Sequence, residues 1–201
     1  MDQKELEIIL SKLDGIQKSK AKLEQYPTPA SVAAALLYRA ALEGDIIGKR
    51  VADLGSGNGI LAIGAKILGA NSVTAIEIDE ESFNVCRRNV QKLGLDIDCI
   101  NGNIEDFQLK VNTVVMNPPF GSQVRDADIP FIEWSINNSE IFYIIMNFKS
   151  GDFLQQYIRN RGEILWKFRV PIEIRRMQNF HRRERVNIDS FILKVRSWQK
   201  I

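Results

Sequence analysis

Two patterns of hydrophobic and polar residues divide this chain into a helical N-terminal part and a longer mixed part. Leu6, Ile9, Leu10 and Leu13 recur at helical spacing and predict a helix over residues 3–14. After a polar, proline-containing stretch, the segment ASVAAALLYRAALEG predicts a strongly apolar helix that ends at its glycine. The first 44 residues are therefore expected to form a helical extension.

From residue 45 onward, short apolar runs alternate with amphipathic segments. The expected strands are residues 50–55, 72–79, 96–100, 111–117 and 140–148, and the expected helices are 58–70, 80–94, 129–138 and 150–160. Two longer β-rich stretches, 163–174 and 186–198, are expected to pair as a final hairpin. Strands that alternate with helices predict a parallel sheet with helices on both faces, so the fold class is α/β.

The composition fits one soluble domain of 201 residues, with the α/β core over residues 45–201. The chain is 45% hydrophobic and 26% charged, and no apolar run is long enough to span a bilayer. The acidic, amphipathic N-terminus does not resemble a signal peptide, so we expect a cytoplasmic protein without a membrane partner. Cys86, Cys99 and the single histidine, His181, do not have the spacing of a zinc site, so no metal is expected.

The charge is distributed unevenly along the chain. Residues 1–148 hold 14 lysines and arginines against 20 acidic residues, whereas residues 149–201 hold 13 against 5. A solvated surface explains such a difference in many proteins, but charge concentrated at one end favours a surface that binds phosphates.

A glycine-rich segment, DLGSGNG, lies between the first expected strand and the following helix. Its glycines allow a ligand to approach the backbone, but the third glycine comes one residue too early for the dinucleotide fingerprint G-x-G-x-x-G. Asp53 at its start repels a pyrophosphate and suits an ammonium group. Glu77, at the end of the next strand, is placed to accept the two hydroxyls of a ribose. A nicotinamide-binding Rossmann domain is the alternative interpretation.

These segments resemble motif I and the following acid of the class I S-adenosylmethionine-dependent methyltransferases. The resemblance implies a Rossmann-like, mostly parallel seven-stranded sheet of order 3-2-1-4-5-7-6, and S-adenosyl-L-methionine as the cofactor. It also assigns parts of the cofactor to individual residues. They are Gly55 and Gly57 for the methionine part, Asp53 for its amino group, Glu77 for the ribose, Ile78 for the adenine face, and Asn103 with Ile104 for the adenine amino group.

The segment Asn117-Pro118-Pro119-Phe120 follows the fourth expected strand. It resembles motif IV of methyltransferases that modify a planar amino nitrogen. The lone pair of such a nitrogen is delocalised, and two acceptors on its N–H groups favour the more nucleophilic pyramidal form. Asn117 Oδ1 and the carbonyl of Pro118 are the expected acceptors, Pro119 stiffens the loop, and Phe120 offers a face for a flipped base. Catalysis then depends mostly on positioning.

Further landmarks narrow the resemblance. EQYPT before the glycine loop, VMNPPFG, and NFHRRERVNIDSFILKV near the end resemble the rRNA adenine-N6 methyltransferases of the methyltransferase-like-five type over residues 22–198. This resemblance implies that Gln25 and Thr28 close over the cofactor and that the substrate is small-subunit rRNA. It also implies a small zinc-ribbon activator protein, for which the strand at 96–100 offers a sheet edge.

The basic run after the first hairpin strand fits an RNA substrate without this resemblance. Arginines can contact phosphates, and aromatic rings can stack on bases. The residues expected to bind RNA are Phe180, His181, Arg182, Arg183 and Arg185. We prefer an RNA contact for His181 to a role as catalytic base.

Two other functions remain open on the sequence alone. A protein N5-glutamine methyltransferase shares the Asn-Pro-Pro-aromatic motif, because glutamine also carries a planar NH2 group. A catalytically silent RNA-binding scaffold is the third interpretation, although the intact Asp53, Glu77, Asn117 and Phe120 speak against it.

Asp128 is expected to cap the helix over 129–138, with Pro130 in the first turn.

Overall fold

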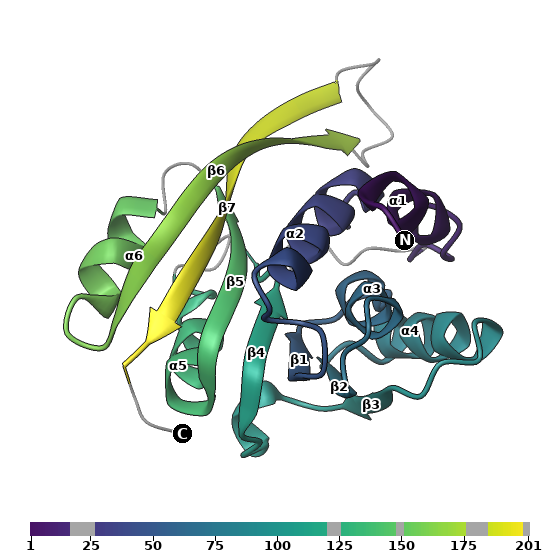
Figure 1. Ribbon diagram of the computed structural model, residues 1–201, viewed down its shortest axis with the longest axis horizontal. Helices are drawn as coiled ribbons and strands as arrows, with labels where there is room; N and C mark the ends of the chain where they lie inside the picture. Colours follow the sequence, from purple (N-terminus) through teal and green to yellow (C-terminus); the bar gives the residue numbers. More distant parts are fainter. Residues whose placement is uncertain (17–26, 120–125, 148–150, 176–184, 199–201) are drawn as a thin grey trace.

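The computed structural model describes residues 1–16, 27–119, 126–147, 151–175 and 185–198. Seven strands form one sheet in the order β3-β2-β1-β4-β5-β7-β6, which confirms the predicted topology (Figure 1). The strands are β1 (Arg50–Leu54), β2 (Ser72–Glu77), β3 (Asp98–Asn101), β4 (Val111–Met116), β5 (Ser139–Asn147), β6 (Gly162–Arg175) and β7 (Arg185–Ser197). Neighbouring strands from β3 to β5 run parallel, and β7 is antiparallel to both β5 and β6.

Helices cover both faces of the sheet. One face carries α1 (Gln3–Leu10), α2 (Ala30–Leu42), α3 (Ile60–Ile67) and α4 (Glu80–Lys92). The other carries the short 3₁₀ helix η2 (Ile104–Asp106), α5 (Ile129–Asn138) and α6 (Gly151–Ile158). No helix among the described residues is both long and apolar enough to cross a bilayer.

Local sequence explains where several helices begin. In α1, the Asp2 carboxylate accepts from the Glu5 N–H while the Glu5 carboxylate accepts from the Asp2 N–H, which forms a capping box. At the start of α4, Asp79 accepts a hydrogen bond from the Ser82 N–H. Asp128 is the N-cap residue of α5 and Pro130 lies in the first turn, as expected, but the Asp128 backbone is already helical and its side chain makes no capping hydrogen bond.

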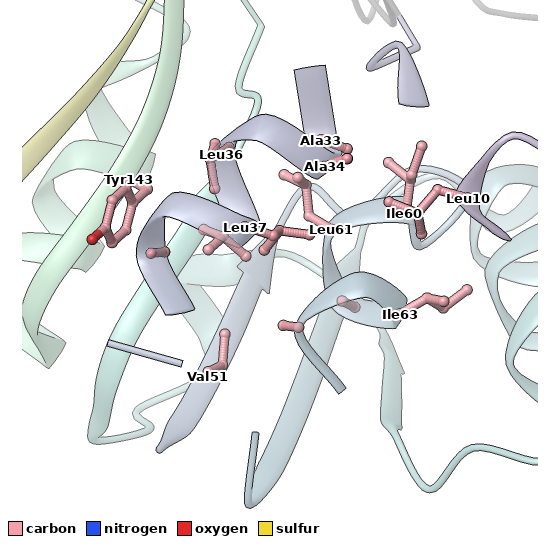
Figure 2. Close-up of a cluster of buried hydrophobic side chains, with 14 of the residues drawn as sticks. Leu10, Ala33, Ala34, Leu36, Leu37, Val51, Ile60, Leu61, Ile63 and Tyr143 are labelled. Carbon is pink, nitrogen blue, oxygen red and sulfur yellow. The ribbon is translucent and has the colours of Figure 1, made fainter. Parts of the chain in front are cut away.

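The core beneath α1, α2 and α3 brings the N-terminal helices into the same packing unit as the sheet (Figure 2). Leu10, Leu36, Leu37 and Leu61 are all buried there. A Cβ on Gly64 would lie 2.4 Å from Leu37 Cδ1, so this glycine lets α2 approach α3 closely. The helices therefore hold the N-terminal segment close to the carboxyl ends of the strands.

The final hairpin, formed by β6 and β7, extends beyond the end of the neighbouring strand β5. The last residue of β5, Asn147, pairs with Ser190, and β6 and β7 remain paired for five more positions, up to Arg175 opposite Arg185. At 3.3 Å per residue, this two-stranded ribbon continues about 16 Å beyond the carboxyl end of β5. The hairpin therefore extends past the edge of the sheet at which the parallel strands end.

Candidate functional site

A cavity of about 270 Å³ lies at the carboxyl ends of the parallel strands. The loops after β1, β2, β3 and β4 all contribute to its walls, as expected for ligand sites in open α/β sheets. The predicted residues that line it are Thr28, Asp53, Gly55, Gly57, Glu77, Ile78, Asn103, Ile104, Asn117 and Pro119. The fold therefore brings together residues that are up to 91 positions apart in the sequence.

The glycine loop has a backbone that favours glycine. Gly55 and Gly57 adopt positive φ angles of 69° and 57°. A Cβ on Gly55 would also lie 3.1 Å from the Phe131 ring. The loop can therefore turn tightly and leave its backbone facing the cavity.

Asp53 is the buried acid at the base of this cavity, with 1% of its surface exposed. Its Oδ2 accepts a hydrogen bond from the Ala62 N–H at 2.9 Å, and its Oδ1 has no hydrogen-bond partner among the described residues. Burial, with a smaller contribution from the charge of Glu77, raises the Asp53 pKa to about 7. A ligand ammonium group would supply the missing partner and restore the charged form.

Glu77 sits at the end of β2 and joins two loops. Its Oε2 accepts from the Gly57 N–H at 2.8 Å, and its Oε1 accepts from the Asp79 N–H at 2.9 Å. Burial raises the Glu77 pKa, although these backbone hydrogen bonds oppose the shift. Each carboxylate oxygen has a second lone pair, so the pair can still accept both hydroxyls of a ribose.

Three residues line the part of the cavity predicted for adenine. Ile78 is 60% exposed, which suits an apolar cover that a bound ring would bury. Ile104 is buried in the cavity wall. The Asn103 side chain caps η2, since its Oδ1 accepts from the Glu105 N–H at 3.2 Å and its Nδ2 donates to Glu105 Oε2 at 3.2 Å. Glu105 also lines the cavity.

Asn117 and Thr28 meet directly. Asn117 Nδ2 donates to Thr28 Oγ1 at 2.9 Å, although the two residues are 89 positions apart. This hydrogen bond fixes the amide plane and leaves Oδ1 as the oxygen available for an acceptor role. Pro119 lines the cavity beside Asn117, whereas Pro118 is buried and is not part of the lining.

Several predicted site residues lie outside the described part of the chain. They are Gln25, Phe120, Phe180, His181, Arg182 and Arg183. Arg185 is described only as the first residue of β7. The roles predicted for these residues remain predictions.

The cavity also contains residues that no local pattern indicated. Phe131, on the first turn of α5, contacts the glycine loop, and Ile16 reaches the cavity from the N-terminal segment. Phe131 follows an aspartate and a proline that mark a helix start, and that signal points to structure rather than to a ligand. Only the tertiary fold brings Ile16 to the site.

These features fit the groups of S-adenosylmethionine. The cavity offers a buried carboxylate with one oxygen that lacks a partner, a second carboxylate beside an open glycine backbone, and an exposed isoleucine for a flat ring. Among the described residues, no group of three or more histidine, cysteine, aspartate or glutamate side chains is arranged to hold a metal ion.

Comparisons with known proteins agree with this geometry. The methyltransferase small domain family matches residues 31–136. The rRNA N(6)-adenosine-methyltransferase METTL5 of Danio rerio is 32% identical over 94% of this chain and 95% of its own length, and an uncharacterized protein of Methanocaldococcus jannaschii is 35% identical over 96% and 93%. A crystal structure of a Pyrococcus horikoshii protein, provisionally named an RNA methyltransferase, superposes with a TM-score of 0.91 at 36% identity and 98% coverage of both chains.

Proposed function

Because this chain belongs to the methyltransferase small domain family, we propose that it transfers a methyl group from S-adenosylmethionine to adenine N6 in small-subunit rRNA. The observation that carries this proposal is the hydrogen bond between Thr28 and Asn117 in the same cavity as the buried Asp53, whose Oδ1 has no hydrogen-bond partner among the described residues. Asn117 offers an acceptor for the amino group of the substrate, and Asp53 offers a partner for the ammonium group of the cofactor. The rRNA adenosine activity is that of the METTL5 relatives.

The cofactor supplies an electrophilic methyl group on a sulfonium centre. The protein's own contribution is to hold the two reactants in line. Asn117 Oδ1 accepts one N–H of the target amino group, and the Pro118 carbonyl accepts the other, so that the lone pair of N6 points toward the methyl carbon. The bound cofactor would supply the methyl group and keep the electrons of its S–C bond as S-adenosylhomocysteine, and the extra proton on N6 would leave to water. No base is needed before the transfer.

The ribbon of β6 and β7 supports RNA as the substrate. It extends beyond the carboxyl end of β5, which is the same edge of the sheet that carries Asn117. The sequence that connects β6 to β7, from residue 175 to residue 185, contains five arginines and one glutamate. Arginines in this connection can contact the phosphates next to a base held at Asn117, and Phe180 and His181 can stack on bases.

We also propose that β3 binds the small zinc-ribbon activator implied by the sequence resemblance. Among the described residues, β3 pairs with β2 alone, so its outer edge has unused backbone groups. A strand from a partner can satisfy these groups and continue the sheet.

The test of the proposed function is methyl transfer from radiolabelled S-adenosylmethionine. Free small-subunit rRNA, small ribosomal subunits and a protein extract are offered in separate reactions, each with and without a zinc-ribbon activator. We expect label in N6-methyladenosine after digestion of the RNA to nucleosides. Label confined to glutamine in protein, or to another nucleoside, would overturn the assignment of adenine N6 in rRNA as the substrate and would leave the cofactor assignment intact.

A further inference from the structure

A buried amide on α4 joins the N-terminal segment to the glycine loop. Asn89 has only 1% of its surface exposed. Its Oδ1 accepts from the Asp14 N–H at 2.9 Å, and its Nδ2 donates to the Asp14 carbonyl at 3.1 Å and to the Asn58 carbonyl at 3.0 Å. One side chain thus binds the backbone of two segments that are 44 residues apart in the sequence.

The glycine loop strengthens this junction from its own side. Asn58 Nδ2 donates to the Asp14 carbonyl at 3.2 Å, and on the surface Lys92 forms an ion pair with the Asp14 carboxylate. Asp14 is therefore held through its N–H, its carbonyl and its side chain. Neither a helix nor a strand includes Asp14, so these contacts take the place of regular secondary structure in fixing it.

The segment held in this way is a wall of the cofactor cavity. Ile16, two residues after Asp14, lines the cavity beside the glycine loop, and its Cδ1 lies 3.9 Å from where a Cβ on Gly57 would be. The same Ile16 also lines a second hollow against the start of α4, together with Glu81 and Arg88. Ile16 therefore borders both hollows, and we call residues 14–16, whose position depends on the contacts of Asp14, the partition.

We propose that Asn89 is a positioning residue for the cofactor. Its amide holds residues 14–16 against the glycine loop, closes the cavity at Ile16, and so sets the affinity for S-adenosylmethionine and S-adenosylhomocysteine. The N-terminal helix α1 then acts in cofactor binding, because it anchors this partition in the core through Leu6 and Leu10. Without the amide, each binding event must also order the partition, and affinity falls.

The test measures S-adenosylhomocysteine binding to the full-length protein by calorimetry. We expect Asn89→Ala to raise the dissociation constant about tenfold, because a net loss of one to two hydrogen bonds has about this effect. In the methyl-transfer assay its KM for S-adenosylmethionine should rise by a similar factor, while kcat at saturation and the KM for RNA stay within about twofold. Lys92→Met, which removes only the exposed ion pair, should change the dissociation constant by less than about threefold.

The matched control is Asn112→Ala. Asn112 also joins two elements through its amide, since it accepts from the Arg50 N–H and donates to Glu140, but it lies at the amino ends of the strands. Both alanine variants are expected to melt at a lower temperature, but only Asn89→Ala should lose much of the stabilisation that S-adenosylhomocysteine adds. If Asn89→Ala does not fold, Asn58→Ala keeps the test open with an expected threefold loss of affinity, about what one weakened hydrogen bond contributes.

An unchanged dissociation constant in Asn89→Ala, or in Asn58→Ala if that variant replaces it, would overturn the proposal. The measurement needs no RNA. A wild-type protein that binds S-adenosylhomocysteine but methylates no rRNA would therefore count against the proposed function alone, and the role of Asn89 would be judged separately.

Discussion

Two groups of charged side chains, each with at least one buried member, differ in electrostatic balance. In the cavity, Asp53 and Glu77 are both acidic, and no cation of the described chain contacts either carboxylate. Below α2, the buried Lys194 ammonium contacts Glu43 at 2.7 Å and Asp45 at 2.6 Å. The first group is left without a counter-charge, and the second is compensated within the protein.

The pKa values report the same difference. Burial raises the Asp53 pKa to about 7. Burial also raises that of Glu43, but hydrogen bonds from Lys194, Arg39 and Trp166 outweigh it and bring the pKa to about 2. The second group joins α2 to β7, and Tyr143 on β5 adds a hydrogen bond to Asp45 at 2.5 Å. The protein thus uses compensated charge for structure and keeps uncompensated charge for a ligand.

Among substitutions in the cavity, Asn117→Ala should have the largest effect on activity. The substitution removes the acceptor that we propose orients the target amino group, so we expect kcat to fall by about 10²- to 10³-fold, as for the loss of one oriented hydrogen bond in a transition state. S-adenosylhomocysteine affinity should stay within about threefold. A variant with full activity in the radiolabel assay would remove Asn117 from the mechanism.

Lys194→Met should have the largest effect on stability. It leaves the partly buried Glu43 and Asp45 without their cation, and we expect the free energy of unfolding to drop by about 2 kcal/mol, less than for a fully buried pair. Chemical denaturation measures the loss, and kcat of the folded fraction should not change. Asp189→Asn, which breaks the exposed pair with Arg169, is the control and should leave the denaturation midpoint nearly unchanged.

Adding Glu43→Gln to Lys194→Met should recover part of the lost stability, because one of the two unpaired acids is then removed. An additive further loss in the double variant would mean that the lysine contributes through packing rather than through charge.

The sequence predicted the sheet far better than it predicted these two groups. Apolar strands alternate with helices over most of the chain, and that local pattern is sufficient for the strands and for the residues at their carboxyl ends, whereas the strand order was implied by the resemblance to the class I methyltransferases. Lys194 lies among apolar residues of β7, and Glu43 lies at a helix end, so each resembles an ordinary surface charge. Their pairing depends on a contact across 151 residues.

The same limit applies within the cavity. Asp53, Glu77 and Asn117 follow strands in recognisable motifs and were predicted. The bond between Thr28 and Asn117 and the amide of Asn89 are long-range contacts between short polar side chains, which have no local signature. Asp128 is the N-cap residue of α5, as predicted, but its backbone is helical there, so its carboxylate is not placed to accept from the first turn.

Asp53→Asn tests whether the uncompensated negative charge in the cavity binds the ammonium group of the cofactor. The amide keeps the size of the side chain but cannot neutralise an ammonium group, so we expect the dissociation constant of S-adenosylhomocysteine to rise between about 10- and 100-fold. Calorimetry at pH 8 measures this loss, because the wild-type carboxyl is then mostly ionised. Equal affinities would mean that the ammonium group binds elsewhere.

The two groups should also respond oppositely to pH in the absence of cofactor. The folded-state pKa of Asp53, about 7, lies above its ordinary value of 3.8, so its contribution to stability is present at low pH and is lost as pH rises from 3.8 to 7. The pKa of Glu43, about 2, lies below its ordinary 4.5, so its contribution is present above pH 4.5 and is lost as pH falls toward 2. The free energy of unfolding is measured by chemical denaturation at a series of pH values. Asp53→Asn should reduce its fall between pH 3.8 and 7, and Glu43→Gln should reduce its fall below pH 4.5.

Thr28→Val should have the smallest effect of these changes. Valine matches the shape of threonine but cannot accept the hydrogen bond from Asn117 Nδ2, so the amide loses the contact that fixes its plane. We expect kcat to fall about tenfold, with S-adenosylhomocysteine binding changed by less than about threefold. Thr28→Ser, which keeps the hydroxyl, should restore most of the rate. If valine instead weakens cofactor binding and leaves kcat intact, Thr28 acts on the cofactor, as the sequence resemblance implied, and not through Asn117.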